Sequence, residues 1–289
     1  MNPQFPLYIV SKKRYDTRYT SRFLESINVP YHIIIEEQEA DLYAQYISRE
    51  KILILDKRYQ DEYETHDDLG YSKSKGPGAA RNFAWDHSIK NGFSWHWVMD
   101  DNIRDFRRFH KNEKVKVSDG SIFKAMEDFV LRYKNIGMAG PNYYMFCPAR
   151  QKQPPFILNT RIYSCNLIKN DLPFRWSGRY NEDTHLSLKI LKSGLCTVQF
   201  NAFLQNKLMT QTIRGGNNED FYKKEGTLAK SKMQVDLHPD ISRLVWRFNR
   251  WHHYVDYKVF KQTLIRDENK FKDIIPVNNY GMELKVKNS

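Results

Sequence analysis

The sequence predicts an α/β fold with one mostly parallel sheet and helices on both of its faces. Short apolar stretches alternate with helix-like stretches through the first third of the chain. This alternation is typical of βαβ units, because parallel strands need a long crossover between them. The 289 residues are enough for one large domain with a sizeable core. An aromatic content of 14% excludes a disordered or low-complexity chain.

The expected elements follow one another in a regular order. In the first half, strands are expected at 6–10, 31–35, 51–55 and 95–99, and helices at 17–27, 39–47 and 78–90. In the second half, helices are expected at 121–133 and 182–192, and strands at 136–139, 157–168 and 196–204. We expect Asp16 or Thr17 to be the N-cap of the first helix, and Asn91 and Gly92 to end the helix at 78–90. Because ligands bind beyond the carboxyl ends of parallel strands, Ser11, Glu36, Asp56 and Asp100 mark the expected site.

The strand pattern stops near Gly216, which divides the chain into a core (1–215) and a basic extension (216–289). We expect helices in the extension at 241–250 and 257–265. The whole chain has 46 Lys and Arg against 34 Asp and Glu, and residues 221–289 hold 14 of these cations against 8 acids. A second basic stretch lies at 103–116, and aromatic residues accompany both stretches. They favour a nucleic-acid groove, although a solvated surface explains either stretch alone about equally well.

The three cysteines, Cys147, Cys165 and Cys196, lack the spacing of a disulfide scaffold or a structural zinc site. The apolar run at 6–10 is too short for a signal segment, and no later run has the ~20 apolar residues that a membrane span needs. We therefore expect a cytoplasmic protein with no membrane partner. The sequence does not indicate an oligomeric state.

The strongest local signal is an apolar strand that runs into Asp100, Asp101 and Asn102. Oxygen ligands at a strand end suit a hard divalent cation that keeps water or diphosphate oxygens as its other ligands. An acidic pair of this kind also often caps a helix or orders a loop. The acids alone therefore leave the metal site and the structural role open.

Three further groups could serve the same site. Glu182 and Asp183 open a helix, either as first-turn acids that favour the helix dipole or as a general base. Glycines precede a helix that begins at Gly78 and carries Arg81, which suits an anionic ligand. His252 and His253 are adjacent, so at most one of them points into a shared site; His238 is a weaker candidate.

The order of these parts resembles the metal-dependent glycosyltransferases of the GT-A fold. Within that fold, the chain resembles the TET-associated glycosyltransferases, phage and eukaryotic proteins linked to sugar transfer onto hydroxymethylated pyrimidines in DNA. The matching segments are 8–14, 35–39, 78–82, 97–103, 181–183 and 251–257. Lys13 stands where the family pattern has a glycine.

The resemblance implies a role for each candidate residue. Asp183 is the expected base that deprotonates the acceptor hydroxyl, and Glu182 helps to bind that acceptor. Asp100, Asn102 and one of His252 and His253 are the expected ligands of Mn²⁺ or Mg²⁺. The expected contacts of the UDP-sugar donor are Ser11, Arg14, Glu37, Gly78, Arg81, Asp100 and Asp101.

The leading hypothesis from the sequence is an inverting transferase. It would move a hexose or a pentose, such as glucose or arabinose, from a UDP-sugar onto hydroxymethylcytosine in DNA. If the chain is phage-encoded, it would act in the cytoplasm of the infected bacterial host. One alternative is a glycan or capsule sugar transferase of the same fold. Another is a metal-dependent nuclease, which leaves the glycine-rich helix at 78–90 without a role.

Overall fold

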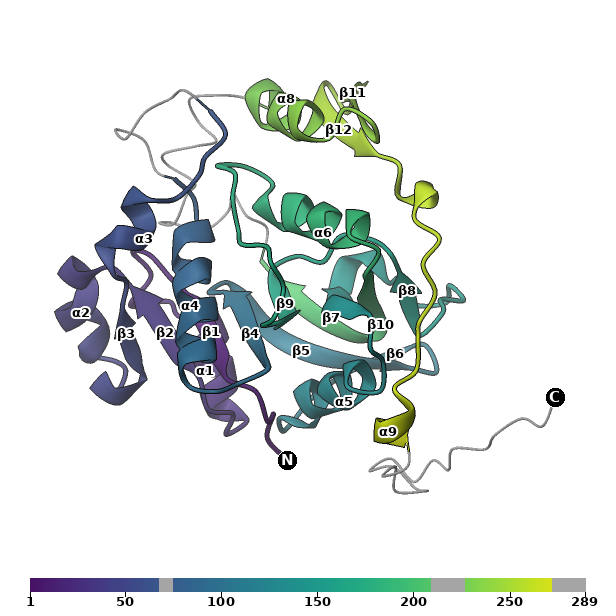
Figure 1. The fold of residues 1–289 in the computed structure, drawn as a ribbon. Helices are drawn as coiled ribbons and strands as arrows, with labels where there is room; N and C mark the ends of the chain where they lie inside the picture. Colours follow the sequence, from purple (N-terminus) through teal and green to yellow (C-terminus); the bar gives the residue numbers. More distant parts are fainter. Residues whose placement is uncertain (68–74, 209–226, 272–289) are drawn as a thin grey trace.

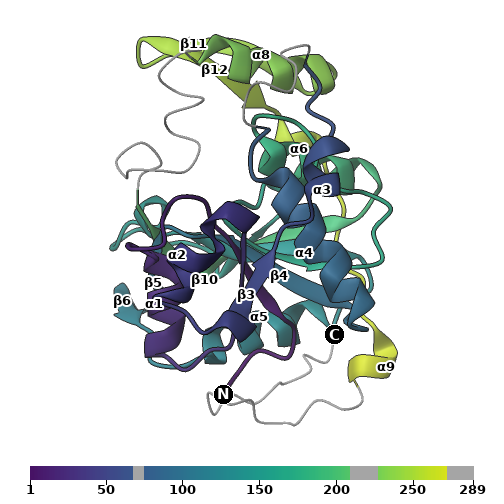
Figure 2. The ribbon, with the colours of Figure 1, turned by 90° about the vertical axis from the view of Figure 1, so that its left-hand side faces the viewer.

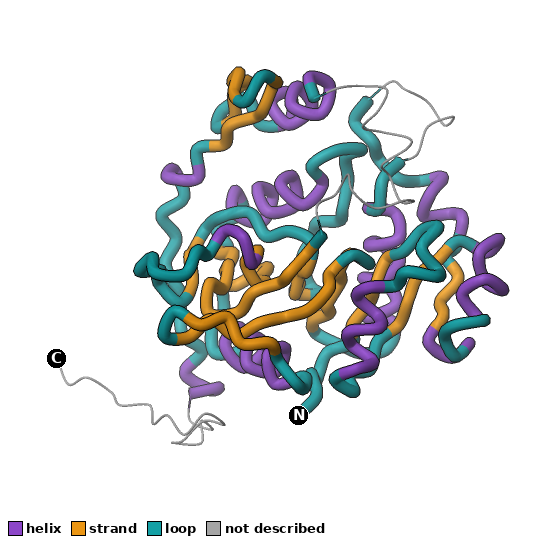
Figure 3. The backbone as a smooth tube through the Cα atoms, turned by 180° about the vertical axis from the view of Figure 1, so that it is seen from behind, coloured by secondary structure: helices purple, strands orange, loops and turns teal. Residues whose placement is uncertain are grey.

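In the computed structural model, the described residues are 1–67, 75–208 and 227–271. A central sheet of ten strands lies between two layers of helices (Figure 1), and the same layering is visible from behind (Figure 3). The strand order is β3-β2-β1-β4-β9-β7-β10-β5-β6, with β8 paired to β10. The strands are β1 (Leu7–Val10), β2 (His32–Ile35), β3 (Ile52–Ile54), β4 (Trp95–Asp100), β5 (Ile103–His110), β6 (Glu113–Lys116), β7 (Ile136–Tyr143), β8 (Phe156–Leu158), β9 (Cys165–Lys169) and β10 (Cys196–Lys207).

The first four strands of that order pair in parallel, as the alternating sequence pattern predicts. β9 runs antiparallel to both of its neighbours, β4 and β7. β7 and β10 then pair in parallel, β5 runs antiparallel to β10, and β6 forms the edge of the sheet antiparallel to β5. The single reversed strand between β4 and β7 therefore brings the start of β9 to the carboxyl end of β4.

Each face of the sheet buries its own set of side chains, because successive residues of a strand point to opposite faces. Leu7 and Ile9 pack with Trp97 against α1 (Tyr19–Ser26), α2 (Ala40–Ala44) and α5 (Ser121–Val130). Tyr8 and Val98 pack on the other face against α4 (Gly78–Lys90) and α6 (Glu182–Lys192). The short helix α3 (Lys57–Asp61) follows β3. The mixed α/β fold that the sequence predicts is confirmed.

Most expected elements are present, with shifted ends. The helices expected at 78–90 and 182–192 have the predicted bounds. The strands expected to end at 139 and 204 continue to Tyr143 and Lys207. The helix expected at 39–47 is a 3₁₀ turn, η1 (Glu37–Glu39), followed by the short α2, and a second turn, η2 (Arg49–Lys51), precedes β3.

The C-terminal extension contains one helix of more than two turns, α8 (Leu228–Leu237), within the part that the structure describes. The helix expected at 241–250 is wrong: those residues form β11 (Ser242–Arg247) and the turn of a hairpin with β12 (Arg250–Val255). Phe248 and Asn249 have φ angles of 52° and 55°, the positive values that a tight two-residue hairpin turn requires. The turn is hard to predict from the sequence, because bulky residues such as Phe248 rarely adopt positive φ angles.

The helix expected at 257–265 is also wrong. A single 3₁₀ turn, η5 (Tyr257–Val259), is followed by an extended segment that binds the core through backbone groups. The Asn135 amide donates to the Thr263 carbonyl at 2.8 Å, and the Lys134 N–H donates to the Ile265 carbonyl at 2.9 Å. These carbonyl groups are satisfied by hydrogen bonds from the core, so they do not need the internal hydrogen bonds of a helix. The segment ends at α9 (Glu268–Phe271) beside α5.

In Figures 1 and 2, α8 and the hairpin lie together at one end of the molecule, beyond α6. The predicted boundary at 215/216 falls outside the described residues. None of the described helices is long and apolar enough to cross a membrane.

Candidate active site

A cavity of about 600 Å³ opens at the carboxyl ends of β1, β2 and β4, where the parallel pattern predicts a ligand site. The predicted residues Ser11, Arg14, Arg81, Asp100, Asp101, Asn102, Glu182 and Asp183 all line it. Glu37, Gly78, His252 and His253 are not among its lining residues.

Ser11, Arg14 and Asp101 form one cluster at the ends of β1 and β4, in which Arg14 and Asp101 are buried. The Ser11 hydroxyl donates to Asp101 Oδ2 at 2.7 Å, and the Arg14 guanidinium makes a short ion pair with Asp101 Oδ1. Both carboxylate oxygens of Asp101 are thus held by the loop that follows β1. Asp101 therefore fixes this loop against the end of β4.

Lys13 has a φ of 56°, in the left-handed region that favours glycine. The glycine expected at this position would adopt that conformation more easily than Lys13 does. At the end of β2, Glu37 is exposed, whereas Glu36 lines the cavity and pairs with Lys12 at 2.8 Å. The acid that lines the cavity at the end of β2 is therefore Glu36 rather than the predicted Glu37.

The N-terminus of α4 faces the cavity through Pro77, Ala79 and Ala80. Within the described ranges no side chain caps this helix, so its first N–H groups can bind an anion. Gly78 has a different role from the predicted one: a Cβ there would lie 1.9 Å from the Tyr63 hydroxyl. Gly78 thus lets the helix pack against Tyr63.

Arg81 joins three acids from two elements. Its guanidinium donates to Asp100 Oδ1 at 2.8 Å, to Asp183 Oδ1 at 2.8 Å and to Glu182 Oε1 at 3.1 Å. It is 1% exposed and lies 4.5 Å from the centroid of the Trp176 ring. Arg81 therefore holds the end of β4 and the start of α6 together, and it also lines the cavity.

Lys207, at the end of β10, was not identified from the sequence. Its Nζ makes an ion pair of 2.5 Å with Asp100 Oδ2 and donates to Ser164 Oγ at 2.8 Å. Burial disfavours its charge, but Asp100 outweighs this effect and raises the pKa of Lys207. The signal was missed because the predicted strand stopped at residue 204, three residues before the lysine.

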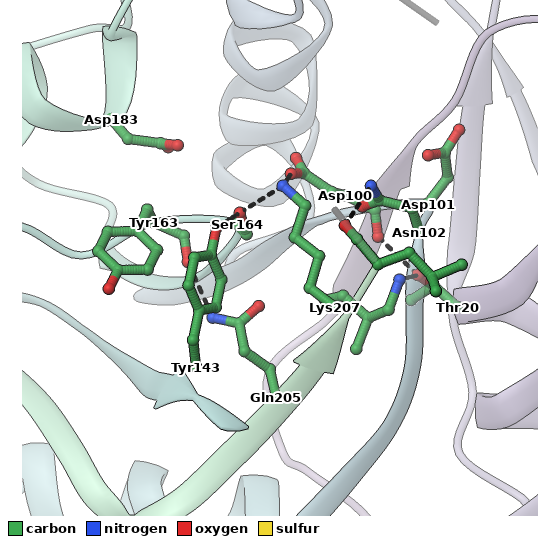
Figure 4. Close-up of polar contacts among 12 residues, drawn as sticks. Thr20, Asp100, Asp101, Asn102, Tyr143, Tyr163, Ser164, Asp183, Gln205 and Lys207 are labelled. Atoms are coloured by element: carbon green, nitrogen blue, oxygen red, sulfur yellow. Dashed lines mark hydrogen bonds and ion pairs between the residues drawn. The ribbon is translucent and has the colours of Figure 1, made fainter. Parts of the chain in front are cut away.

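Asp100 and Asp183 have pKa values displaced in opposite directions. Burial alone would raise the pKa of Asp100, but the charges of Lys207 and Arg81 hold it well below its usual range. Burial raises the pKa of Asp183 to about 7; the Arg81 charge opposes this shift, and the charges of Glu182 and Asp100 add to it. Figure 4 shows Asp183 projecting from α6 into the cavity, apart from the Asp100–Lys207 pair. Two acids separated in this way suit different roles, one as a permanent charge and one as a base.

Asp100 and Asn102 fit a divalent cation in a limited way. Among the described residues, the buried Asn102 Oδ1 has no hydrogen-bond partner, so it can accept a cation. Asp100 supplies a carboxylate two residues earlier, and its two oxygens also pair with Arg81 and Lys207. Mg²⁺ in nucleotide sites often has only one or two protein ligands and takes the others from water and phosphate. Among the residues that the structure describes, no cluster of three or more His, Cys, Asp or Glu side chains could hold a metal.

His252 and His253 do not join Asp100 and Asn102. They are neighbours on β12, so their side chains point to opposite faces of the hairpin, as their adjacency predicts. Burial, with the charges of Arg161 and Lys230, lowers the pKa of His253 to about 4. Arg161 and Lys230 line the cavity, so the extension reaches its rim through Lys230 of α8.

Residues 5–216 match the family model of the TET-associated glycosyltransferases, which covers the sheet and all the carboxylates described above. No match was found among curated proteins.

Proposed function

The chain belongs to the TET-associated glycosyltransferases, and we propose that it moves a sugar from a UDP-sugar onto hydroxymethylcytosine in DNA. The sugar is a hexose or a pentose, such as glucose or arabinose, and the reaction inverts its anomeric carbon. The observation that carries the proposal is the pair of acids held by Arg81, with Asp100 kept charged and the pKa of Asp183 near 7.

Asp183 is the proposed base. Arg81 contacts its Oδ1, and among the described residues no hydrogen bond involves Oδ2. That oxygen can take the proton of the acceptor hydroxyl as the hydroxyl oxygen attacks the anomeric carbon. The bond from the anomeric carbon to the diphosphate breaks in the same displacement, which inverts the configuration. Glu182 shares the Arg81 guanidinium and keeps it oriented toward Asp183.

The departing UDP carries negative charge that the cavity must stabilise. The uncapped start of α4 offers N–H groups, and Lys207 offers a buried ammonium beside Asp100. A Mn²⁺ or Mg²⁺ ion at Asp100 and Asn102 would add positive charge at the same place. The donor therefore lies along the ends of β1, β2 and β4, and the acceptor enters from the side of Asp183.

Transfer is tested with duplexes that contain hydroxymethylcytosine or cytosine, a panel of UDP-sugars and Mn²⁺. Mass spectrometry of the digested nucleosides should show a sugar mass on the modified DNA alone. Failure of every donor to add a sugar would refute the proposal.

Asp183→Asn should abolish transfer, because the amide cannot take a proton, while DNA binding persists. Asp171→Asn is the matched control, since Asp171 is exposed and pairs only with Lys169 among the contacts described. Transfer by the Asp183→Asn protein at the wild-type rate would exclude Asp183 as the base.

A further inference from the structure

The wall of the cavity opposite the donor strands is aromatic. Tyr143 and Tyr163 have ring centroids 4.3 Å apart, and the Arg161 guanidinium lies 5.0 Å from the Tyr163 ring. The Tyr143 hydroxyl is fixed by Ser164 at 2.6 Å. Figure 4 shows both rings on the same side of the Asp100–Lys207 pair as Asp183. Rigid aromatic faces with a nearby guanidinium form a stacking site for a planar nucleobase.

A loop with exposed apolar side chains leads out of this wall. The 3₁₀ turn η3 (Tyr144–Phe146) follows β7 directly, and its residues Met145 and Phe146 are 57% and 49% exposed. Phe146 lines the cavity and has its ring centroid 5.4 Å from that of Tyr143. The apolar tip thus continues the aromatic wall to the surface.

The loop is anchored on both sides of this tip. Lys114 donates to the Tyr144 carbonyl at 2.7 Å, and its ammonium lies 3.9 Å from the centroid of the Tyr144 ring. Cys147, directly after the turn, is fully buried beside Asn142 and Asn201. A loop held in this way can press its side chains against a partner without first becoming ordered.

The surroundings of the tip are cationic. Arg107 and Lys114 come from the β5–β6 hairpin, the basic stretch of the sequence, and pack around Tyr144. Arg150 and Lys152 are exposed in the segment that follows the turn. Cations beside an apolar tip match the phosphates and the base stack of a nucleic-acid duplex.

We propose that the η3 loop is a wedge that opens duplex DNA. Phe146, supported by Met145, enters the base stack, and the displaced base stacks on Tyr143 and Tyr163 with its hydroxymethyl group toward Asp183. The inference rests on the proposed function, because it assigns the acceptor of that reaction to this wall. A base inside a duplex cannot present its hydroxymethyl group to a buried carboxylate, so extrusion is required.

The test compares Phe146→Ala with wild type on paired and on single-stranded DNA that contains hydroxymethylcytosine. Transfer to the duplex should fall roughly 10- to 100-fold, because the unpaired state loses the side chain that stabilises it. Transfer to the single strand should change by less than about threefold, since no stack has to be opened. Phe93→Ala is the matched control: Phe93 is 38% exposed, lies at the opposite end of β4, and should leave both rates unchanged.

A second measurement follows opening without any chemistry. In a duplex with 2-aminopurine beside the hydroxymethylcytosine, wild type and Phe93→Ala should raise the fluorescence on binding, and Phe146→Ala should not. Equal losses on the two DNA forms, with an unchanged fluorescence response, would overturn the wedge. If no donor sugar is transferred to any DNA, the proposed function fails, and the fluorescence still decides the wedge.

Discussion

Two hairpins carry basic and aromatic side chains, and they use them differently. In β5–β6, Lys114 packs on Tyr144 and so supports the wall of the active-site cavity. At the tip of β11–β12, Trp246 and Phe248 are 58% and 87% exposed. The first hairpin is built into the central sheet, whereas the second belongs to a separate two-stranded sheet. The two hairpins are therefore similar in composition but differ in role, because the fold places only β5–β6 beside the cavity.

The second hairpin packs on α8, and the α8 segment contacts α6 at the side of the cavity. The Asn181 amide donates to the Lys230 carbonyl at 2.7 Å, and Lys192 pairs with Asp240 at 2.7 Å. Asn181 immediately precedes Glu182 and Asp183. α8 thus contacts the residue that precedes the proposed base, although α8 lies outside the matched residues 5–216.

Removal of Arg81 should give the largest effect on the core. Arg81→Met leaves Asp100, Glu182 and Asp183 buried without their shared cation, so the free energy of unfolding should fall by about 3–5 kcal/mol. Urea denaturation measures the loss. The matched variant in the second hairpin, Arg247→Met, removes an exposed cation and should change stability by less than about 0.5 kcal/mol. Similar losses of unfolding free energy in Arg81→Met and Arg247→Met would contradict the proposed difference between the core and the second hairpin.

Replacement of Lys207 should impair transfer rather than folding alone. Lys207→Met should lower kcat about 100- to 1000-fold, the usual effect of removing one oriented group that stabilises developing charge. Lys207→Arg should retain part of the rate, because it keeps the cation. Steady-state kinetics and calorimetric binding of UDP measure the two effects, with Lys169→Met as a control at the surface pair with Asp171. A Lys207→Met enzyme with wild-type kcat and UDP affinity would remove Lys207 from the reaction.

The pH profile tests the base. Since the pKa of Asp183 is raised to about 7, its carboxylate is scarce at pH 5.5 and dominant at pH 8.5. The rate of transfer should therefore rise about tenfold per pH unit below 7 and level off above it. Initial rates between pH 5.5 and 8.5 measure the profile. A rate that stays constant over this range would contradict a base with that pKa.

Acid should loosen the attachment of the extension. His185 Nδ1 and His238 Nε2 are 2.8 Å apart, and burial lowers the pKa of His185 to about 2 and that of His238 to about 4. Both rings stay neutral in the folded protein, while the unfolded chain gains protons below pH ~6.5. The stability they support is full above that pH and should fall by roughly 2–4 kcal/mol for the two rings together by pH 5. The charged or titratable groups facing them are His66, Lys189, Lys192 and Asp240.

Hydrogen exchange measures this loosening. Amides of α8 should exchange faster at pH 5 than at pH 7.5, after correction for the intrinsic rate, while amides of α5 change little. Equal protection of α8 at both pH values would exclude the histidine pair as an acid-sensitive contact.

The sequence could predict the parts of the site that follow short strands with clear alternation. Ser11, Arg14 and Asp100 reach the cavity, because the ends of the parallel strands β1 and β4 meet at one edge of the sheet. Asp183 reaches it from the first turn of α6. Lys207 and the aromatic wall were missed, because they depend on the length of β10 and on the reversed strand β9, which are long-range pairings. The hairpin at 242–255 was missed because two residues with positive φ, one of them Phe248, form its turn.

The reversed strand β9 also has a consequence for specificity. The donor-side residues come from the segment before it, up to Asn102, and the aromatic wall comes from Tyr143, Phe146 and Tyr163, later in the chain. The two halves meet at Asp100, Arg81 and Lys207 and otherwise use different stretches of sequence. Under the proposed function, substitutions in one half would change the donor sugar without changing the nucleobase that is accepted, and substitutions in the other half would do the reverse. The fold is in this respect modular, and the ion pairs of Asp100 with Arg81 and Lys207 are the contacts that both halves share.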